Sequence, residues 1–134
     1  MFHICSEVFI PEGKLEGFKA AYSEALAKME KAEPGTHSYM IHISEDGTKC
    51  QVDQYYFSEA DFIAHLKASG PMLQEVLDAY KTDVRYWIFS RIESAEVKEI
   101  IPKIANLDLL VVGPPFRGYT REASGGPATW LDSD

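Results

Sequence analysis

His65 is the residue whose type and setting most clearly could do chemistry, because it lies among helix-forming residues in the segment FSEADFIAHLKASGP. It follows Phe62 by three residues and precedes Leu66 by one, so on a helix it flanks the apolar stripe. A histidine at such a boundary can donate one hydrogen bond at the edge of the core. It can also contact a ligand, because a neutral imidazole accepts a proton near neutral pH. The spacing leaves both interpretations open.

Polar residues on two predicted strands could meet this histidine in a pocket. Gln54 and Tyr56 share one side of the segment KCQVDQYYF, whereas strand alternation points Asp53 to the opposite side. An amide such as that of Gln54 can orient a ligand but cannot abstract a proton. Tyr39, in the segment THSYMIHIS, is a further candidate for ligand contact. The other histidines fit strand edges or the amino-terminal segment: His3, His37 and His42.

Arginine and tryptophan share one side of the segment TDVRYWIFSRI. Arg85 and Trp87 alternate there with apolar residues, and Arg91 follows on the same side. Taken singly, the tryptophan fits a core position and the arginines fit ion pairs with acidic neighbours. As a set they could clamp an aromatic anion, since guanidinium groups attract negative charge and stack on aromatic faces.

The first half of the chain must supply the scaffold for these side chains. Residues 2–9 are mostly apolar, with β-branched and aromatic members, which predicts a strand. An apolar stripe at helical spacing predicts a helix from Lys14 to the EPG sequence at residues 33–35, where proline and glycine end it. Two strands follow, joined by a hairpin at Asp46-Gly47, because these residues supply the positive φ angles of a tight turn.

The next segment predicts two helices and a strand. Ser58 and Asp61 stand in the relation of a capping box, which predicts a helix from Ser58 to about Ser69. Gly70-Pro71 would end that helix and begin another, before the long strand TDVRYWIFSRI. The order strand, helix, strand, strand, helix pair, strand is typical of an α+β, ferredoxin-like antiparallel sheet with helices on one face.

The face of this sheet without helices is predicted to be covered by a second copy of the chain. In an open sheet that face should be polar, yet large apolar residues lie on both sides of the strands. Trp87 and Phe89, for example, oppose Tyr86 and Ile88. A two-fold homodimer is the simplest cover, because it applies the same surface twice.

The carboxyl-terminal part is predicted to serve this dimer. Residues 94–113 indicate a helix, which Pro102 kinks or shortens, and then a short apolar strand, DLLVV. A strand beyond a complete four-stranded unit needs an edge to join, and the partner's sheet could offer one, which would place the segment at the dimer interface. Residues 1–121 then form a single domain, and residues 122–134 are predicted to be a loose tail.

Composition excludes several classes of partner. The 134 residues carry a formal net charge of −8, and such an acidic surface repels phosphate backbones and anionic lipids, so neither nucleic acid nor membrane is expected. No apolar run approaches the roughly 20 residues that span a bilayer, and the start of the chain lacks a signal-peptide pattern. Cys5 and Cys50 lack metal-ligand spacing, so we expect no metal site and two reduced thiols in a cytoplasmic protein.

The segment from EPG through AHL resembles the central part of the antibiotic biosynthesis monooxygenase superfamily. The matching features are the EPG turn, the SEDGT hairpin, an aromatic residue that ends the third strand, and AHL on the next helix. The resemblance covers about residues 2–91 and implies a dimeric α+β barrel. Members of that superfamily include cofactor-independent monooxygenases for quinols and polycyclic phenols, haem-degrading enzymes, and proteins without known activity.

The first of these activities needs no metal or flavin, because the substrate itself reduces oxygen. The protein must remove a proton, hold the resulting anion and keep out bulk water. Many relatives carry a glutamate where this chain has Gln54, and some carry a second histidine where it has SGPM. The haem-degrading branch uses an asparagine on its first strand, whereas the only asparagine here is Asn106, so haem degradation is not expected.

Two functions therefore stand as expectations. In the first, the chain is a cofactor-independent monooxygenase that oxidises a quinol or polyphenol-type aromatic with O₂, and His65 is its base or hydrogen-bond donor. The expected substrate contacts are Gln54, Tyr56, Arg85, Trp87 and Tyr39. In the second, the same pocket serves a non-catalytic dimer that binds a small aromatic molecule. The amide at position 54 favours the second function, and the better-known members of the superfamily favour the first.

Overall fold

The computed structural model describes residues 1–103 and 108–132. The elements of the main body, in chain order, are β1 (Phe2–Phe9), α1 (Leu15–Ala32), β2 (Thr36–Ile43), β3 (Lys49–Tyr56), α2 (Glu59–Ala79) and β4 (Asp83–Ile88). They are followed by α3 (Ala95–Ile100), a short 3₁₀ helix (Ile101–Lys103), β5 (Asp108–Val111), β6 (Arg117–Thr120) and β7 (Thr129–Asp132).

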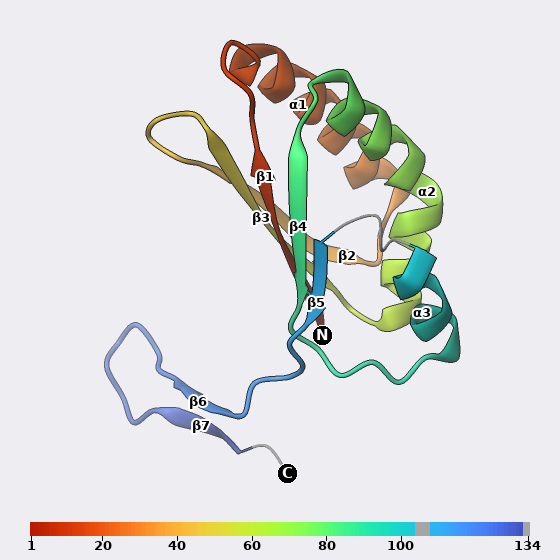
Figure 1. Ribbon diagram of the computed structural model, residues 1–134. Helices are drawn as coiled ribbons and strands as arrows, with labels where there is room; N and C mark the ends of the chain where they lie inside the picture. Colours follow the sequence, from red (N-terminus) through yellow and green to blue (C-terminus); the bar gives the residue numbers. More distant parts are fainter. Residues whose placement is uncertain (104–107, 133–134) are drawn as a thin grey trace.

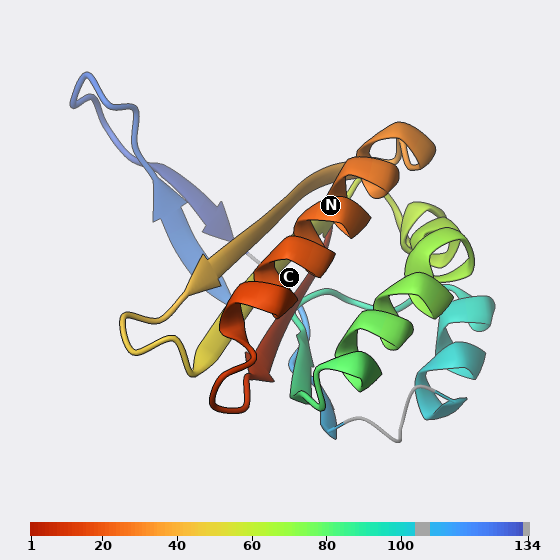
Figure 2. The same cartoon turned by 90° about the horizontal axis from the view of Figure 1, so that it is seen from above.

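A five-stranded sheet with the order β2-β3-β1-β4-β5 forms the centre of the molecule. Every neighbouring pair is antiparallel except β4 and β5, which run parallel. Helices α1, α2 and α3 all lie on one face of this sheet (Figure 1, Figure 2). The prediction of a ferredoxin-like α+β fold with helices on one face is confirmed.

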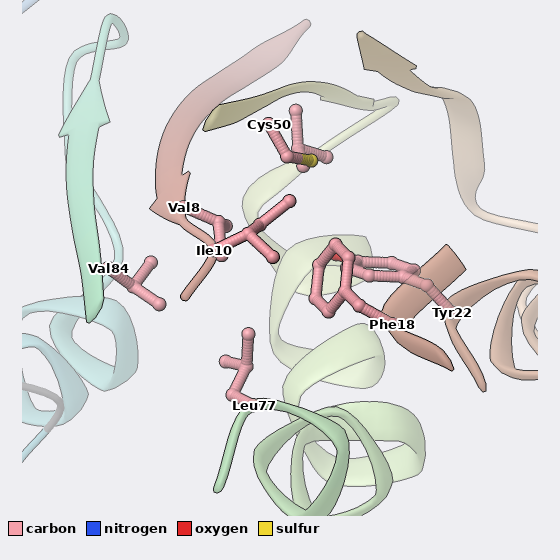
Figure 3. Close-up of a cluster of buried hydrophobic side chains, with 8 residues drawn as sticks. Val8, Ile10, Phe18, Tyr22, Cys50, Leu77 and Val84 are labelled. Carbon is pink, nitrogen blue, oxygen red and sulfur yellow. The ribbon is translucent and has the colours of Figure 1, made fainter. Parts of the chain in front are cut away.

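The core fills the space between this sheet face and the two long helices, because both carry apolar residues at the matching period. Along β3 the buried side chains alternate, and along α1 they recur at helical spacing, as in Phe18, Tyr22, Ala25 and Met29. Figure 3 shows one cluster, in which residues of β1, β3 and β4 meet residues of both helices. Its labelled members are Val8, Ile10, Phe18, Tyr22, Cys50, Leu77 and Val84.

Helix α2 is one continuous helix, which corrects the predicted pair. Ser58 caps it as expected, accepting a hydrogen bond from the Asp61 backbone N–H at 3.2 Å. Pro71 lies inside the helix and does not end it. The reason is that buried residues on both sides of the proline, Phe62 and Leu77 among them, pack on the same sheet. This packing outweighs the one backbone hydrogen bond that proline cannot make.

The turn between β2 and β3 occurs at Asp46-Gly47, as predicted, but the two residues do not both have positive φ angles. Only Gly47 has a positive φ, 71°. Asp46 instead accepts hydrogen bonds from the Ser44 hydroxyl at 2.8 Å, the Thr48 hydroxyl at 2.7 Å and the Thr48 N–H at 3.0 Å. These bonds hold the pKa of Asp46 down at about 2, so the carboxylate stays charged and fixes the turn.

The carboxyl-terminal elements differ from the expectation in two ways. The short apolar strand exists as β5, but it pairs with β4 of its own chain, whereas the prediction placed it at an edge of the partner's sheet. The predicted loose tail contains β7, which pairs with β6 in a separate two-stranded sheet. The helix is shortened around Pro102, as predicted, and becomes 3₁₀ at Ile101. Asn106 lies outside the described residues.

The face of the sheet away from the helices is only partly covered. One row of side chains crosses it in register, one from each strand: Met40, Asp53, Cys5, Trp87 and Leu110. Both ends of the row are open, since Met40 and Leu110 are each 58% exposed. Cys5 on this face and Cys50 on the other are free thiols, as expected. Among the described residues, no helix is long and apolar enough to cross a membrane.

Candidate functional site

A cavity of about 370 Å³ lies between α2 and the helix-covered face of the sheet. Its wall is mainly apolar, with aliphatic and aromatic side chains from β1, β4 and α2, among them Ile4, Leu73 and Ile88. The polar side chains on its wall are Ser6, Tyr22, Tyr39, Gln54, His65, Gln74, Tyr86 and Lys103. A largely apolar cavity with a few polar groups is the usual form of a small-molecule site.

The centre of the site is a buried pair formed by His65 and Glu33. Nδ1 of His65 lies 2.6 Å from Oε1 of Glu33, and both side chains are at most 5% exposed. The Ser69 hydroxyl donates to the other carboxylate oxygen, and the Thr36 hydroxyl donates to Oε1 at 3.1 Å. The carboxylate therefore has a partner for each oxygen, which compensates for its removal from water.

The local sequence explains how these groups meet. Glu33 is the C-cap of α1, and its backbone N–H still bonds to the Met29 carbonyl at 2.9 Å. It stands four residues after Met29, so it continues the buried stripe of α1 toward α2. His65 and Ser69 are also four residues apart and point from one face of α2. The end of one helix thus supplies the acceptor, and a full turn of the other supplies two donors.

Gly35 allows the turn after Glu33 to approach the start of α2 closely. A Cβ at this position would collide with the side chain of Asp61. The Gly35 carbonyl also accepts a hydrogen bond from the Phe57 N–H at 3.1 Å. The EPG sequence therefore does more than end a helix, because it docks the end of α1 against the beginning of α2 and fixes Glu33 beside His65.

The charge of Glu33 is held by its hydrogen bonds. Burial alone would raise the pKa of Glu33, but the hydrogen bonds from His65, Ser69 and Thr36 together lower it below its ordinary value. An ionised carboxylate accepts hydrogen bonds only, so it fixes the proton of a neutral His65 on Nδ1. Nε2 of His65 is then the nitrogen with a free lone pair, and it belongs to a side chain on the cavity wall.

Buried tyrosines surround this imidazole. The Tyr39 and Tyr56 rings lie 6.0 and 5.2 Å from the His65 ring, centroid to centroid. The hydroxyls of Tyr22 and Tyr39 are 2.5 Å apart, and the Tyr56 hydroxyl donates to Oε1 of Gln54 at 2.6 Å. Burial raises the pKa of Tyr22, Tyr39 and Tyr56 well above the ordinary value, so these hydroxyls stay neutral and can donate hydrogen bonds.

The structure brings together only part of the set of residues predicted from the sequence. His65, Tyr39 and Gln54 lie on the cavity wall, and Tyr56, fully buried, lies directly behind them. Arg85 and Trp87 do not join them. These two residues pair across the sheet with Glu7 and Cys5 on the helix-free face, and the Arg85 guanidinium lies 5.5 Å from the centre of the Phe9 ring.

Glu33, Ser69 and Tyr22 are among the site residues that are absent from the sequence prediction. Glu33 is part of the EPG sequence, which the prediction used only as a helix stop. Its position four residues beyond Met29, in line with the apolar stripe, was the available signal. The same spacing of four links Ser69 to His65. In residues 1–103 and 108–132, no group of three or more His, Cys, Asp or Glu side chains could hold a metal ion.

Comparison with known proteins defines the class of the fold. The chain matches no protein-family model and no curated protein. The crystal structure of MupZ from Pseudomonas fluorescens matches with a TM-score of 0.69 and 20% identity, over 94% of this chain and 98% of MupZ.

Two further solved structures share the fold. The crystal structure of an antibiotic biosynthesis monooxygenase matches with a TM-score of 0.58 and 12% identity, over 69% of this chain and 100% of that one. A protein from Deinococcus radiodurans, proposed to be an antibiotic biosynthesis monooxygenase, matches with a TM-score of 0.59 and 11% identity, over 70% and 95% of the two chains. This chain therefore has the α+β fold of the antibiotic biosynthesis monooxygenases.

Proposed function

We propose that the chain is a cofactor-independent monooxygenase that oxidises a small aromatic molecule bearing an acidic hydroxyl, such as a quinol or polyphenol. The observation that carries the proposal is the buried Glu33–His65 pair, whose histidine lies on the wall of a largely apolar cavity. A carboxylate bonded to Nδ1 orients the ring and stabilises the imidazolium that forms when Nε2 takes a proton. The carboxylate that Gln54 does not supply is thus supplied, through His65, by Glu33.

The cavity suits the anion that such a proton transfer leaves behind. The Tyr22 and Tyr39 hydroxyls form a donor pair on its wall, and only one of them can donate to the other, which leaves a hydroxyl proton for the ligand. Tyrosine hydroxyls take the place of the guanidinium clamp that the sequence suggested at Arg85. The apolar wall excludes water, which strengthens each of these hydrogen bonds.

The reaction balances without an added reductant. Loss of the hydroxyl proton to His65 gives a phenolate that shares its charge with the ring carbons. An electron then passes to O₂, and recombination forms a carbon–oxygen bond and a ring peroxide. His65 returns its proton to this peroxide, which becomes a ring hydroperoxide. Loss of the ring hydrogen with cleavage of the O–O bond gives a quinone and one water. The substrate supplies both hydrogens of that water and all the electrons that reduce O₂.

A second candidate function is binding without turnover. Its support is that Arg85 and Trp87 lie on the other face of the sheet, so neither forms part of the wall of this cavity. In that case the same pocket holds a small aromatic molecule, and His65 and Tyr39 form hydrogen bonds with it without a net proton transfer.

We also propose that the working unit is a homodimer joined through the helix-free face. The row from Met40 to Leu110 crosses all five strands of that face, and it includes the indole of Trp87. Large exposed apolar groups on an otherwise formed sheet mark an interaction surface. A two-fold axis would cover the same row on both copies.

Oxygen uptake tests the proposed reaction. A panel of reduced quinols and polyphenols is supplied to the protein in air, and wild type is compared with His65→Ala and with His37→Ala, a control histidine that is exposed on the edge strand β2. We expect His65→Ala to lower the rate by about 100-fold or more, because a positioned base contributes at least that much. With ¹⁸O₂, one labelled atom should enter the product. Saturable binding with uptake no faster than background would favour the binding function.

A further inference from the structure

The hairpin β6–β7, residues 117–132, projects from the molecule as an arm. Figures 1 and 2 both show it on the side of the sheet opposite the helices, away from the body. It exposes large apolar side chains: Tyr119 is 55%, Trp130 is 54% and Leu131 is 47% exposed. An isolated two-stranded hairpin is only marginally stable in water, so an ordered arm of this kind calls for a surface to pack on.

The linker directs the arm away from its own body. The chain leaves β5, turns at Gly113, which has a φ of 95°, and continues through Pro114 and Pro115. Two consecutive prolines form a stiff, extended spacer. The glycine sets the direction and the prolines hold it, so the arm is carried outward to where a neighbouring molecule would lie.

One face of the arm has the composition of a binding surface. Tyr119 and Trp130 are opposite each other across the two strands, with ring centroids 4.9 Å apart. Arg117 stacks on the Trp130 ring at 5.2 Å, and Arg121 stacks on the Tyr119 ring at 5.4 Å. Tryptophan, tyrosine and arginine are the residues that dominate binding energy at protein interfaces.

The chemistry of the helix-free sheet face complements this arm. The cross-sheet row offers apolar ends at Met40 and Leu110 and an acidic side chain, Asp53, between them. Asp53 faces the imidazoles of His3 and His42, with its oxygens 3.8 and 3.6 Å from their Nε2 atoms. No lysine or arginine takes part in those contacts, and Arg117 and Arg121 lie on the Tyr119–Trp130 face of the arm.

We propose that the arm is exchanged between two copies of this chain, each packing its Tyr119–Trp130 face on the helix-free face of the other. The exchange rests on the homodimer proposed above, and it adds the arms as the contact that stabilises this homodimer. Because each copy has both an arm and a receiving face, the exchange is reciprocal and closes at two chains. The arms then cover apolar surface that a contact between the two sheets alone would leave exposed at the edge of the interface.

Photo-crosslinking tests the contact directly. A benzophenone amino acid replaces Trp130, and unlabelled chains are mixed with ¹⁵N-labelled chains before irradiation. We expect covalent dimers of mixed isotope whose crosslinks map to β2, β4 or β5 on the helix-free face. The same probe at the exposed Glu24 of α1 serves as the control and should give no dimer. Crosslinks confined to one chain, or mapped to the helices of the other, would overturn the exchange.

Sedimentation equilibrium separates the exchange from dimerisation itself. The double variant Tyr119→Ser, Trp130→Ser should raise the dimer dissociation constant at least about 10-fold, since each buried aromatic anchor typically contributes more than 1 kcal/mol. Thr129→Ser, on the other face of the same hairpin, is the matched control and should leave the constant unchanged. An unchanged constant in the double variant would refute the exchange while leaving the dimer intact. A wild type that is monomeric throughout would refute both.

Discussion

At the level of single residues, the proposed chemistry depends on one buried carboxylate and one imidazole. Glu33 is held by three hydrogen-bond donors, and one of them, His65, lies on the wall of the cavity. His65 is recognisable from the sequence because it lies beside an apolar stripe at helical spacing. Glu33 is harder to predict, because its role depends on a contact between two helices whose contacting residues are far apart in the sequence.

Replacing Glu33 by glutamine tests the role of the carboxylate as a positioning group. The amide oxygen of Glu33→Gln can still accept the hydrogen bond from Nδ1, but it no longer offsets the positive charge on His65. We expect the rate of oxygen uptake to fall about 10-fold or more, with the acid limb of its pH profile moved to lower pH. A rate loss without a change in the profile would indicate that Glu33 acts only through packing.

The same carboxylate predicts how stability depends on pH. The pKa of Glu33 is lowered in the folded protein from an ordinary value of 4.5, so its ionised form favours the fold. That contribution is present in full above the ordinary value and disappears as the pH falls through the lower, folded value.

Urea unfolding at neutral and acid pH measures this effect. Wild type should lose more unfolding free energy on acidification than Glu33→Gln, which has no carboxylate to protonate at this site. At neutral pH the variant should be less stable by about 1–3 kcal/mol, because its amide N–H₂ meets donors that need an acceptor. Equal pH dependence in the two proteins would contradict the charged state assigned to Glu33.

At the scale of elements, hydrophobic periodicity predicts the order and type of the strands and helices of the body. It fails where tertiary contacts outweigh a local signal. Gly70-Pro71 indicates a break in a helix, yet α2 runs through it, since the residues on either side pack on one sheet. The side of a strand is predictable from alternation, but whether a given side faces the helices is not. For this reason Arg85 and Trp87 could not be separated from the cavity on sequence alone.

Two glycines give a matched test of how the elements meet. Gly35→Ala would place a Cβ against Asp61, forcing apart the EPG turn and the start of α2, and should cost about 1–3 kcal/mol in unfolding free energy. Gly70→Ala meets no atom within 4 Å and lies inside a helix, so it should stabilise by about 0.5–1 kcal/mol. Thermal unfolding compares them, and equal effects of both changes would contradict the close approach at Gly35.

At the scale of the whole molecule, the helices account for only one face of the sheet. The other face carries a cross-sheet row with exposed ends, and the arm projects on that same side. The apolar character of this face is predictable from the strand sequences, because both sides of the strands hold large apolar groups. The arm was not predicted, since its two strands are short and separated by a segment that contains two glycines and a proline.

Solution mass is the corresponding measurement. At micromolar concentration, sedimentation should give twice the chain mass of 15.1 kDa. Removal of apolar surface from water drives such an association, so the dimer should persist in high salt. A single species of chain mass at every concentration would contradict the assignment of the helix-free face as an interface.

The central claim is that a bound ligand transfers its hydroxyl proton to His65. The visible absorption spectrum of a bound dye tests this claim most directly. A hydroxylated quinone dye, whose visible spectrum differs between the neutral and ionised hydroxyl, is titrated into the protein under argon at a pH where the free dye is neutral. We expect the ionised spectrum on binding to wild type, and the neutral spectrum on binding to His65→Ala. A bound dye that stays neutral in wild type, or that ionises equally in both proteins, would contradict this claim.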